Sequence, residues 1–310
     1  MHAEREIPNN APLIAGVELG GTKGVALVAR GQTILARERV PTTNPNETLG
    51  TLSNWLRAHH AESPFAALGI ATFGPVGLDR AHPDYGHITR TPKPGWTQAD
   101  VRGTFTRWFD GPVGFDTDVN GAALAEGRWG AAVGSSSHIY LTIGTGIGGG
   151  LVVNGAPVHG FVHPEMGHVR VRRVPGDDFA GICPYHGDCL EGLASGPALG
   201  QRTGLRGDLI PVDHPVWARM AAEMAELLVN LILIASPGQI LIGGGVAMGQ
   251  AGLLPKVRDA VAERLNGYVL GMDREALDSM IRTPALGDDA GPLGAIALGL
   301  DALAAEKQPA

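Results

Sequence analysis

The sequence is poor in cysteine: only two occur among 310 residues, both in the stretch GICPYHGDCLEG at residues 181–192. It also lacks an apolar signal core at its N-terminus, and its most apolar helical run, LLVNLILIAS, is too short to cross a bilayer. We therefore expect a cytoplasmic protein that does not bind membranes. Thiols stay reduced in that compartment, which disfavours a disulfide between the two cysteines.

An excess of positive charge is also absent. The formal net charge of −7 argues against a broad nucleic-acid-binding surface, so we expect no nucleic-acid partner. A local basic pocket for a phosphorylated ligand is still compatible with this charge. The hydrophobic content of 44% is enough for a large core, and the length fits one large domain or two medium ones.

Glycine, in contrast, is abundant and clustered, with 46 residues, about twice ordinary usage. One cluster lies in LIAGVELGGTKGVALVARG (13–31) and a second in HIYLTIGTGIGGGLVVNG (138–155). Both read as a strand, a glycine turn and a returning strand, and each opens a segment with alternating strand and helix patterns. The repetition predicts a duplicated α/β architecture.

The remaining elements follow from hydrophobic period, with Asn46 expected to cap the first helix. Residues 74–96 form a proline- and glycine-rich loop, whose length is typical of binding or lid segments. The patterns predict strands at 13–19, 24–29, 33–40, 66–72, 112–116 and 239–242, and helices at 47–60, 97–109, 119–129, 214–235 and 292–305.

Three glycine turns are candidate phosphate cradles, because glycine lets backbone N–H groups converge on an anion. None matches the pattern GxxxxGK[ST] or a full GxGxxG with its acidic partner. Taken singly, each turn is equally well a tight hairpin turn, but three together favour a binding role. The candidate residues are Gly20, Gly21, Thr22, Lys23, Gly144, Thr145, Gly146, Gly244 and Gly245.

A carboxylate, Asp118, stands between a predicted strand and a predicted helix in FDTDVNGAALAEG. It either caps the helix, a part that Asp116 could also play, or acts as a general base on a hydroxyl group.

The two cysteines flank a histidine in the spacing C-x₂-H-x₂-C, with Cys183, His186 and Cys189 as candidate metal ligands. A structural zinc site needs a fourth ligand, and the nearby candidates are His159, His163, His168 and Asp188. A disulfide, or two thiols with an unrelated histidine, are the alternatives. Fe²⁺ or Co²⁺ in place of zinc is also open.

The motifs together resemble the ROK family of sugar kinases over nearly the whole chain, and most closely its bacterial fructokinase-type branch. The resemblance rests on ELGGTK, FGPVGLD, TPKPGW, FDTDVNGAALAE, IGTGIGGG, HPEMGHVRVRR, CPYHGDCLEGLASGP and IGGGV. It implies the two-lobed, duplicated α/β fold of sugar kinases, actin and heat-shock ATPases, which is ribonuclease H-like, with a zinc-binding loop at 163–191. The expected lobes are 12–117 with 293–310, and 118–292.

The resemblance also implies ATP-dependent phosphorylation of the 6-hydroxyl of a hexose, with fructose as the first expectation. Asp118 falls on the catalytic aspartate of the family. Glu165, His168 and Glu191 fall on its sugar-binding residues, and His168 is selected as the fourth ligand of a structural zinc. Thr117 replaces the sugar-contacting Asn of many ROK glucokinases, which argues against glucose.

Further expectations from the resemblance are ATP and Mg²⁺ as cofactors, with Glu18 acting on Mg²⁺ through its waters, and a homodimer. Trp96 either packs its loop or stacks on the sugar. A mannokinase, a glucokinase or a broad hexokinase is the alternative within the family. The alternative from another class is a sugar-sensing regulator, although only about a dozen residues precede the first predicted strand, too few for a DNA-binding domain.

Overall fold

The computed structural model describes residues 11–307, which divide into two compact units. Unit 1 contains the described residues up to Trp129, the segment His159–His163 and the chain from Asp288 onward. Unit 2 contains Gly130–Val158 and Pro164–Gly287. The predicted boundary at 117/118 differs from this division, which keeps the helix after residue 117 in unit 1.

The two units repeat one sheet plan. In unit 1 the strand order is β3-β2-β1-β4-β5, with β1 antiparallel to β2 and parallel to β4. In unit 2 the order is β10-β9-β6-β7-β8, with β6 antiparallel to β7 and parallel to β9. Each sheet thus opens with the glycine-tipped hairpin seen in the sequence, and the predicted duplicated α/β architecture is confirmed.

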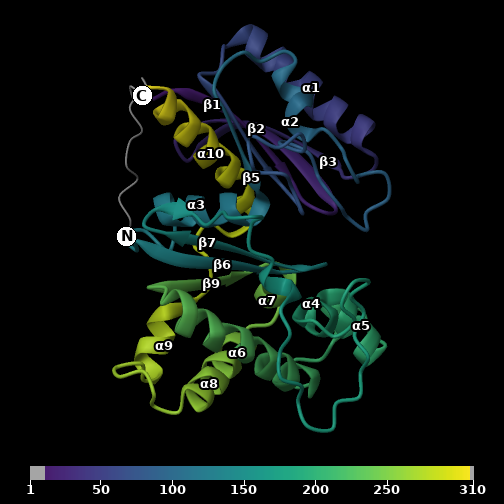
Figure 1. Cartoon of the computed structure of the whole chain (residues 1–310), viewed down its shortest axis with the longest axis vertical. Coiled ribbons are helices and arrows are strands. Elements are labelled where there is room, and N and C mark those ends of the chain that lie inside the picture. The colour runs from purple at the N-terminus through teal and green to yellow at the C-terminus, as the bar shows by residue number, and fades with distance from the viewer. Residues whose placement is uncertain (1–10, 308–310) are drawn as a thin grey trace. The chain divides into compact units, whose positions relative to one another are not determined.

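Unit 1 places helices on both faces of its sheet (Figure 1). Its elements are β1 (Leu13–Leu19), β2 (Lys23–Arg30), β3 (Thr33–Pro41), α1 (Pro45–Glu62), β4 (Ala67–Thr72), α2 (Val101–Thr106), β5 (Val113–Thr117), α3 (Asp118–Trp129), η3 (Gly287–Asp289, shared with the end of unit 2) and α10 (Ala290–Glu306). Along β1, Leu13 and Ala15 face the α1 side whereas Ile14 packs with Ile296 of α10, as the two-residue period of a strand requires.

Helix α10 lies directly on the backbone of the central strands. A Cβ at Gly69 of β4 would stand 1.7 Å from the carbonyl oxygen of Ala295, and one at Gly114 of β5 would stand 2.2 Å from that of Leu298. Only glycine allows this close approach. The approach brings the first turn of α10 towards the carboxyl ends of β4 and β5.

The cap of the first helix lies two residues earlier than predicted. Asn44, not Asn46, accepts the backbone N–H of Glu47 at 3.0 Å, and Pro45 occupies the first turn. The prediction of Asn46 was therefore wrong. Proline has a fixed φ suited to the first helical position, so the cap falls on the residue before it.

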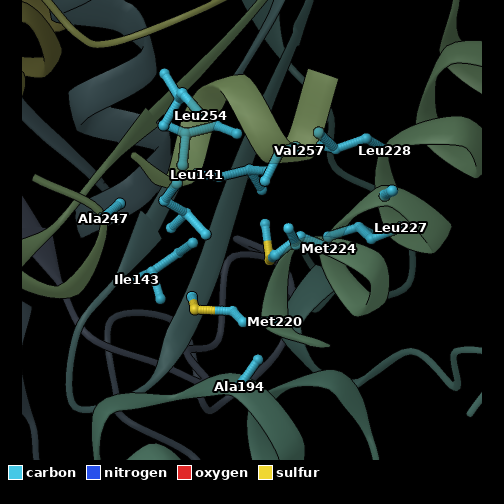
Figure 2. Close-up of a cluster of buried hydrophobic side chains, with 14 of the residues drawn as sticks. Leu141, Ile143, Ala194, Met220, Met224, Leu227, Leu228, Ala247, Leu254 and Val257 are labelled. Carbon is cyan, nitrogen blue, oxygen red and sulfur yellow. The ribbon is translucent and has the colours of Figure 1, made fainter. Parts of the chain in front are cut away.

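Unit 2 buries its core between its sheet and the helices α6 and α8. Figure 2 shows Met220, Met224, Leu227 and Leu228 of α6 around side chains of β6 and α8. The elements are β6 (Ser137–Ile143), β7 (Ile147–Val153), β8 (Ala156–Pro157), η1 (Met166–His168), α4 (Leu190–Ala194), α5 (Gly196–Thr203), η2 (Gly207–Leu209), α6 (Val216–Ala235), β9 (Gln239–Gly243), α7 (Gly245–Met248), α8 (Leu253–Leu265), α9 (Arg274–Met280) and β10 (Ile281–Arg282).

The loop at 74–96 is anchored by its last residue. Trp96 is fully buried, its indole N–H donates to the carbonyl oxygen of Thr43 at 2.8 Å, and its ring meets Phe73 edge-on. Trp96 therefore packs the loop, which settles the two interpretations of that residue. Within residues 11–307, no helix combines the length and the apolar character needed to span a membrane.

Candidate functional site

The turn between β5 and α3 presents Asp118 at the carboxyl end of a strand. One oxygen of Asp116 accepts the N–H of Thr117 at 2.7 Å and the side-chain amide of Asn120 at 2.8 Å. The hydroxyl oxygen of Thr117 accepts the backbone N–H of Asn120 at 3.1 Å. Thr117 therefore caps α3 and Asp116 holds the cap residue, while Asp118 accepts the N–H of Val119 at 2.9 Å. Thr117 itself is buried, with 2% of its surface exposed.

A second carboxylate, Glu18 at the end of β1, lies close enough to Asp118 for the two charges to interact. Burial, and then the charge of Asp118, raise the pKa of Glu18 to about 7. Burial likewise raises the pKa of Asp118 to about 6, against the opposing bond from Val119. One oxygen of Glu18 is buried and has no hydrogen-bond partner among the described residues. Two neighbouring carboxylates, of which Glu18 has a buried oxygen without a hydrogen-bond partner, are suited to binding a divalent cation.

The first glycine turn, between β1 and β2, has its carbonyl oxygens engaged. Thr42 donates its hydroxyl to the oxygen of Gly20 at 2.9 Å and its N–H to that of Thr22 at 3.0 Å. Lys93 of the long loop donates its ammonium group to the oxygen of Gly21 at 2.7 Å. The carbonyl oxygens of the turn thus hold it in place by accepting hydrogen bonds. A second lysine, Lys23, lies near enough to Glu18 for its charge to lower the pKa of Glu18.

The second and third glycine turns meet within unit 2. The second spans Gly144–Gly146 between β6 and β7 and is held by the N–H of Gly196, which donates to Gly144 at 2.8 Å. The third follows β9 at Gly244, whose φ is +88° and whose Cβ would stand 2.4 Å from the carbonyl oxygen of Ile143. Glycine is required there on both counts. The structure therefore joins two of the three predicted cradles.

The four predicted metal ligands converge in unit 2. One donor atom from each of His168, Cys183, His186 and Cys189 lies within 4.8 Å of the others. The Nδ1 of His168 lies 3.5 Å from the sulfur of Cys189 and 3.7 Å from that of Cys183, and His186 Nδ1 lies 3.6 Å from Cys183. Both cysteines are free and buried. Burial raises the pKa of Cys189 to about 11, a penalty on the thiolate that a bound cation offsets.

The other candidates for the fourth ligand are engaged elsewhere. His159 bonds to Asp116 and His163 accepts the N–H of Val76, both within unit 1. Asp188 pairs with Arg170 and, at 3.2 Å, with Arg173. The geometry thus agrees with the choice of His168.

Glu191 connects the metal cluster to the second glycine turn. One of its oxygens accepts the N–H of Ile147 at 2.9 Å, and the other lies 3.9 Å from Nε2 of His168. A Cβ on Gly146 would stand 2.6 Å from this carboxylate, so the turn needs glycine to admit it. If a metal were bound at Nδ1 of His168, a carboxylate on the Nε2 side would help to orient the ring. Glu165 is exposed and precedes the short helix that carries His168.

Two contacts of the site were not predicted from the sequence. Asp116 and His159 lie 43 positions apart and form a hydrogen-bonded pair next to Asp118. Lys93 lies 72 positions from Gly21 and bonds to it. The signals were a spare carboxylate two residues before Asp118, and a lysine between two prolines in TPKPGW.

Comparison with known proteins places these features in context. A family model described as the ROK family matches residues 14–302. A fructokinase from Zymomonas mobilis is 47% identical over 307 residues, covering 97% of this chain and 99% of that protein. A fructokinase from Pediococcus pentosaceus is 42% identical over 292 residues, covering 94% of this chain and 99% of that protein.

Solved structures show the same fold. A ROK hexokinase from Thermus thermophilus superposes with a TM-score of 0.78 at 29% identity, over 96% of this chain and all of that one. A ROK family glucokinase from Streptomyces griseus, solved with glucose and AMPPNP, gives 0.70 at 25% identity, over 93% of this chain and 99% of that one.

Proposed function

The chain belongs to the ROK family, and from that premise we propose that it is an ATP-dependent fructokinase, which phosphorylates D-fructose at its 6-hydroxyl. The observation that carries the proposal is the identity of 47% and 42% to two fructokinases over almost the full length of each. The glucokinase with bound AMPPNP, a non-hydrolysable ATP analogue, supports ATP as the phosphoryl donor.

Asp118 acts as the general base. It accepts the proton of the 6-hydroxyl as the new O–P bond forms to the γ-phosphorus and the bond to the leaving ADP breaks. With a pKa of about 6, the carboxylate is ionised at neutral pH and more basic than an ordinary aspartate. A positioned base of this kind contributes roughly 10²- to 10⁴-fold to the rate.

Glu18 would help to hold Mg²⁺, and Mg²⁺ when bound would neutralise charge on the phosphates. Its orphaned oxygen and raised pKa support this role, since a nearby cation stabilises the ionised form. The turn Gly20–Lys23 supplies N–H groups, a hydroxyl and an ammonium group to phosphate oxygens.

In unit 2, Gly144, Thr145 and Gly146 bind phosphate, while Gly244 and Gly245 approach the nucleotide closely because no side chain intervenes. Glu165 and Glu191 accept hydrogen bonds from sugar hydroxyls, and the imidazole N–H of His168 donates one. In unit 1, Thr117 stands beside the base at the sugar.

The metal is a structural zinc. Two thiolates and two imidazoles would supply the four ligands that a structural zinc takes, so the metal would stabilise the fold rather than catalyse the reaction. His168 directs Nδ1 to the thiols and Nε2 towards Glu191, so the metal fixes a side chain of the sugar-binding set. The protein is further proposed to be cytoplasmic and to form a homodimer, which light scattering after size-exclusion chromatography tests.

The function is tested by incubating the purified protein with Mg·ATP and, separately, fructose, mannose and glucose, and identifying the product by ³¹P NMR. The expected product is fructose 6-phosphate. A mannokinase, glucokinase or broad hexokinase would instead phosphorylate its own sugar as well or better. A sugar-sensing regulator would bind sugar without releasing ADP, an outcome that would exclude the kinase proposal.

A further inference from the structure

We propose that Asp116 and His159 form a positioning pair for Asp118, in which the imidazole holds the buried carboxylate and the carboxylate holds the turn that presents the base. The inference rests on the proposed function, because it assigns the pair to the phosphoryl-transfer step. It concerns unit 1 alone.

The hydrogen bonds form a continuous chain from the histidine to the base. Nε2 of His159 lies 2.9 Å from one oxygen of Asp116. The other oxygen of Asp116 accepts the N–H of Thr117 and the side-chain amide of Asn120, which flank Asp118 on both sides. A displacement of Asp116 therefore moves the two residues that set the position of Asp118.

Burial makes the pair energetically necessary. The Asp116 side chain is 3% exposed, and an ionised carboxylate at that depth requires hydrogen bonds and a compensating charge. His159 supplies a hydrogen bond at 2.9 Å, and the same bond raises the pKa of His159 above its ordinary value, which favours its charged form. Its ring is 41% exposed, so it reaches the buried carboxylate from the surface.

The segment that carries His159 is seated at a second point. His163, four residues later and 4% exposed, accepts the N–H of Val76 at 3.1 Å, and a Cβ on Gly74 would stand 3.1 Å from its ring. Val76 and Gly74 follow β4, and Asp116 lies near the end of β5, the neighbouring parallel strand. The two histidines therefore fasten the segment His159–His163 across the carboxyl ends of both strands, where Asp118 lies.

The pair has a function distinct from that of a general stabilising contact. Without His159, Asp116 loses the partner that orients it, and the turn that carries Asp118 shifts with it. A displacement of about 1 Å at a catalytic group costs on the order of 10²-fold in rate. The cost should therefore fall on kcat, whereas the KM for ATP should stay unchanged.

The test compares His159→Ala with His159→Gln, whose side-chain amide offers a donor near the position of Nε2. His82→Ala is the matched control, because His82 is a surface histidine that pairs with Asp84 and is 60% exposed. We expect His159→Ala to lower kcat about 10- to 100-fold with the KM for ATP within about twofold. His159→Gln should recover most of this loss, and His82→Ala should match the wild type.

The proposal is overturned if His159→Ala leaves kcat unchanged, or if His159→Gln is as slow as His159→Ala at equal thermal stability. An NMR titration supplies a measurement that does not depend on activity or on the alanine variant. The pKa of His159 should fall in Asp116→Asn relative to the wild type, and an unchanged value would equally refute the pair. If the wild type phosphorylates no sugar, the proposed function fails and the titration alone decides on the pair.

Discussion

Replacing Asp118 with asparagine should abolish catalysis and stabilise the protein at the same time. Burial holds the pKa of Asp118 at about 6, above the ordinary value of 3.8. The folded state therefore keeps the proton more tightly than the unfolded chain does, and folding is penalised once the group ionises. Asparagine is nearly isosteric and carries no charge, so the variant escapes the penalty.

The magnitude follows from the two pKa values. Each pH unit between them corresponds to about 1.4 kcal/mol, so the interval from 3.8 to about 6 amounts to about 3 kcal/mol at full ionisation. The side chain is partly accessible to water, which reduces the penalty, and we expect a gain of about 1–3 kcal/mol at pH 8. At pH 5 the gain in unfolding free energy should be about half of its value at pH 8, and below the pKa of the unfolded chain it should vanish.

The assay is urea unfolding at pH 5 and pH 8, followed by tryptophan fluorescence. Four of the five tryptophans lie in unit 1 with Asp118, so the signal reports mainly on that unit. Asp110→Asn is the matched control, because Asp110 is exposed and its replacement should change the unfolding free energy by less than about 0.5 kcal/mol. A gain that is absent at pH 8, or equal at both pH values, would show that burial does not penalise the ionised Asp118.

Three further predictions concern other parts of the site. Cys183→Ser should lower the melting temperature and raise the KM for fructose and for ATP together, because Glu191 joins the metal cluster to the N–H of Ile147; an unchanged KM for either substrate would contradict that link. Lys93→Met should raise the KM for ATP about three- to tenfold with little change in stability, since the ammonium group bonds to the first glycine turn and a cation beside a phosphate contributes about 1 kcal/mol; steady-state kinetics with ATP as the varied substrate checks this. Asp177→Asn should destabilise the protein by about 3–5 kcal/mol, because the Asp177 carboxylate pairs with the buried Arg202. Burial raises the pKa of Asp177, but the hydrogen bonds from Arg202 and Arg173 outweigh burial and hold that pKa at about 2. Calorimetry at pH 7 measures the loss, and a value below about 1 kcal/mol would show that the pairing is unimportant.

The parts of the fold that could be predicted from the sequence depend on local patterns. The two hairpins were visible because strand period and glycine tips repeat within short windows. The metal quartet was accessible because three ligands lie within seven residues and the family motif supplied His168. The helix cap was predicted at Asn46, two residues after its actual position at Asn44. Pro45 decides between the two asparagines, because proline favours the first helical position and the cap is the residue before it.

The contacts that sequence reasoning missed join distant positions. His159 was considered only as a zinc ligand, yet it meets Asp116, 43 positions away, because the segment His159–His163 docks beside β4 and β5. Glu191 was expected at the sugar, and the structure adds its bond to Ile147, 44 positions away. Neither contact leaves a periodic or motif signal, since each depends on how the sheets place their strand ends.

Fructose phosphorylation with Asp118 as the base can be measured by a coupled ADP-release assay that gives kcat/KM for fructose, mannose and glucose, with Asp118→Asn run in parallel. We expect kcat/KM for fructose to exceed that for glucose by at least about tenfold, and the variant to lose at least about 10²-fold with fructose. Sugar-independent ADP release, a preference for glucose, or an Asp118→Asn protein as active as the wild type would contradict this expectation.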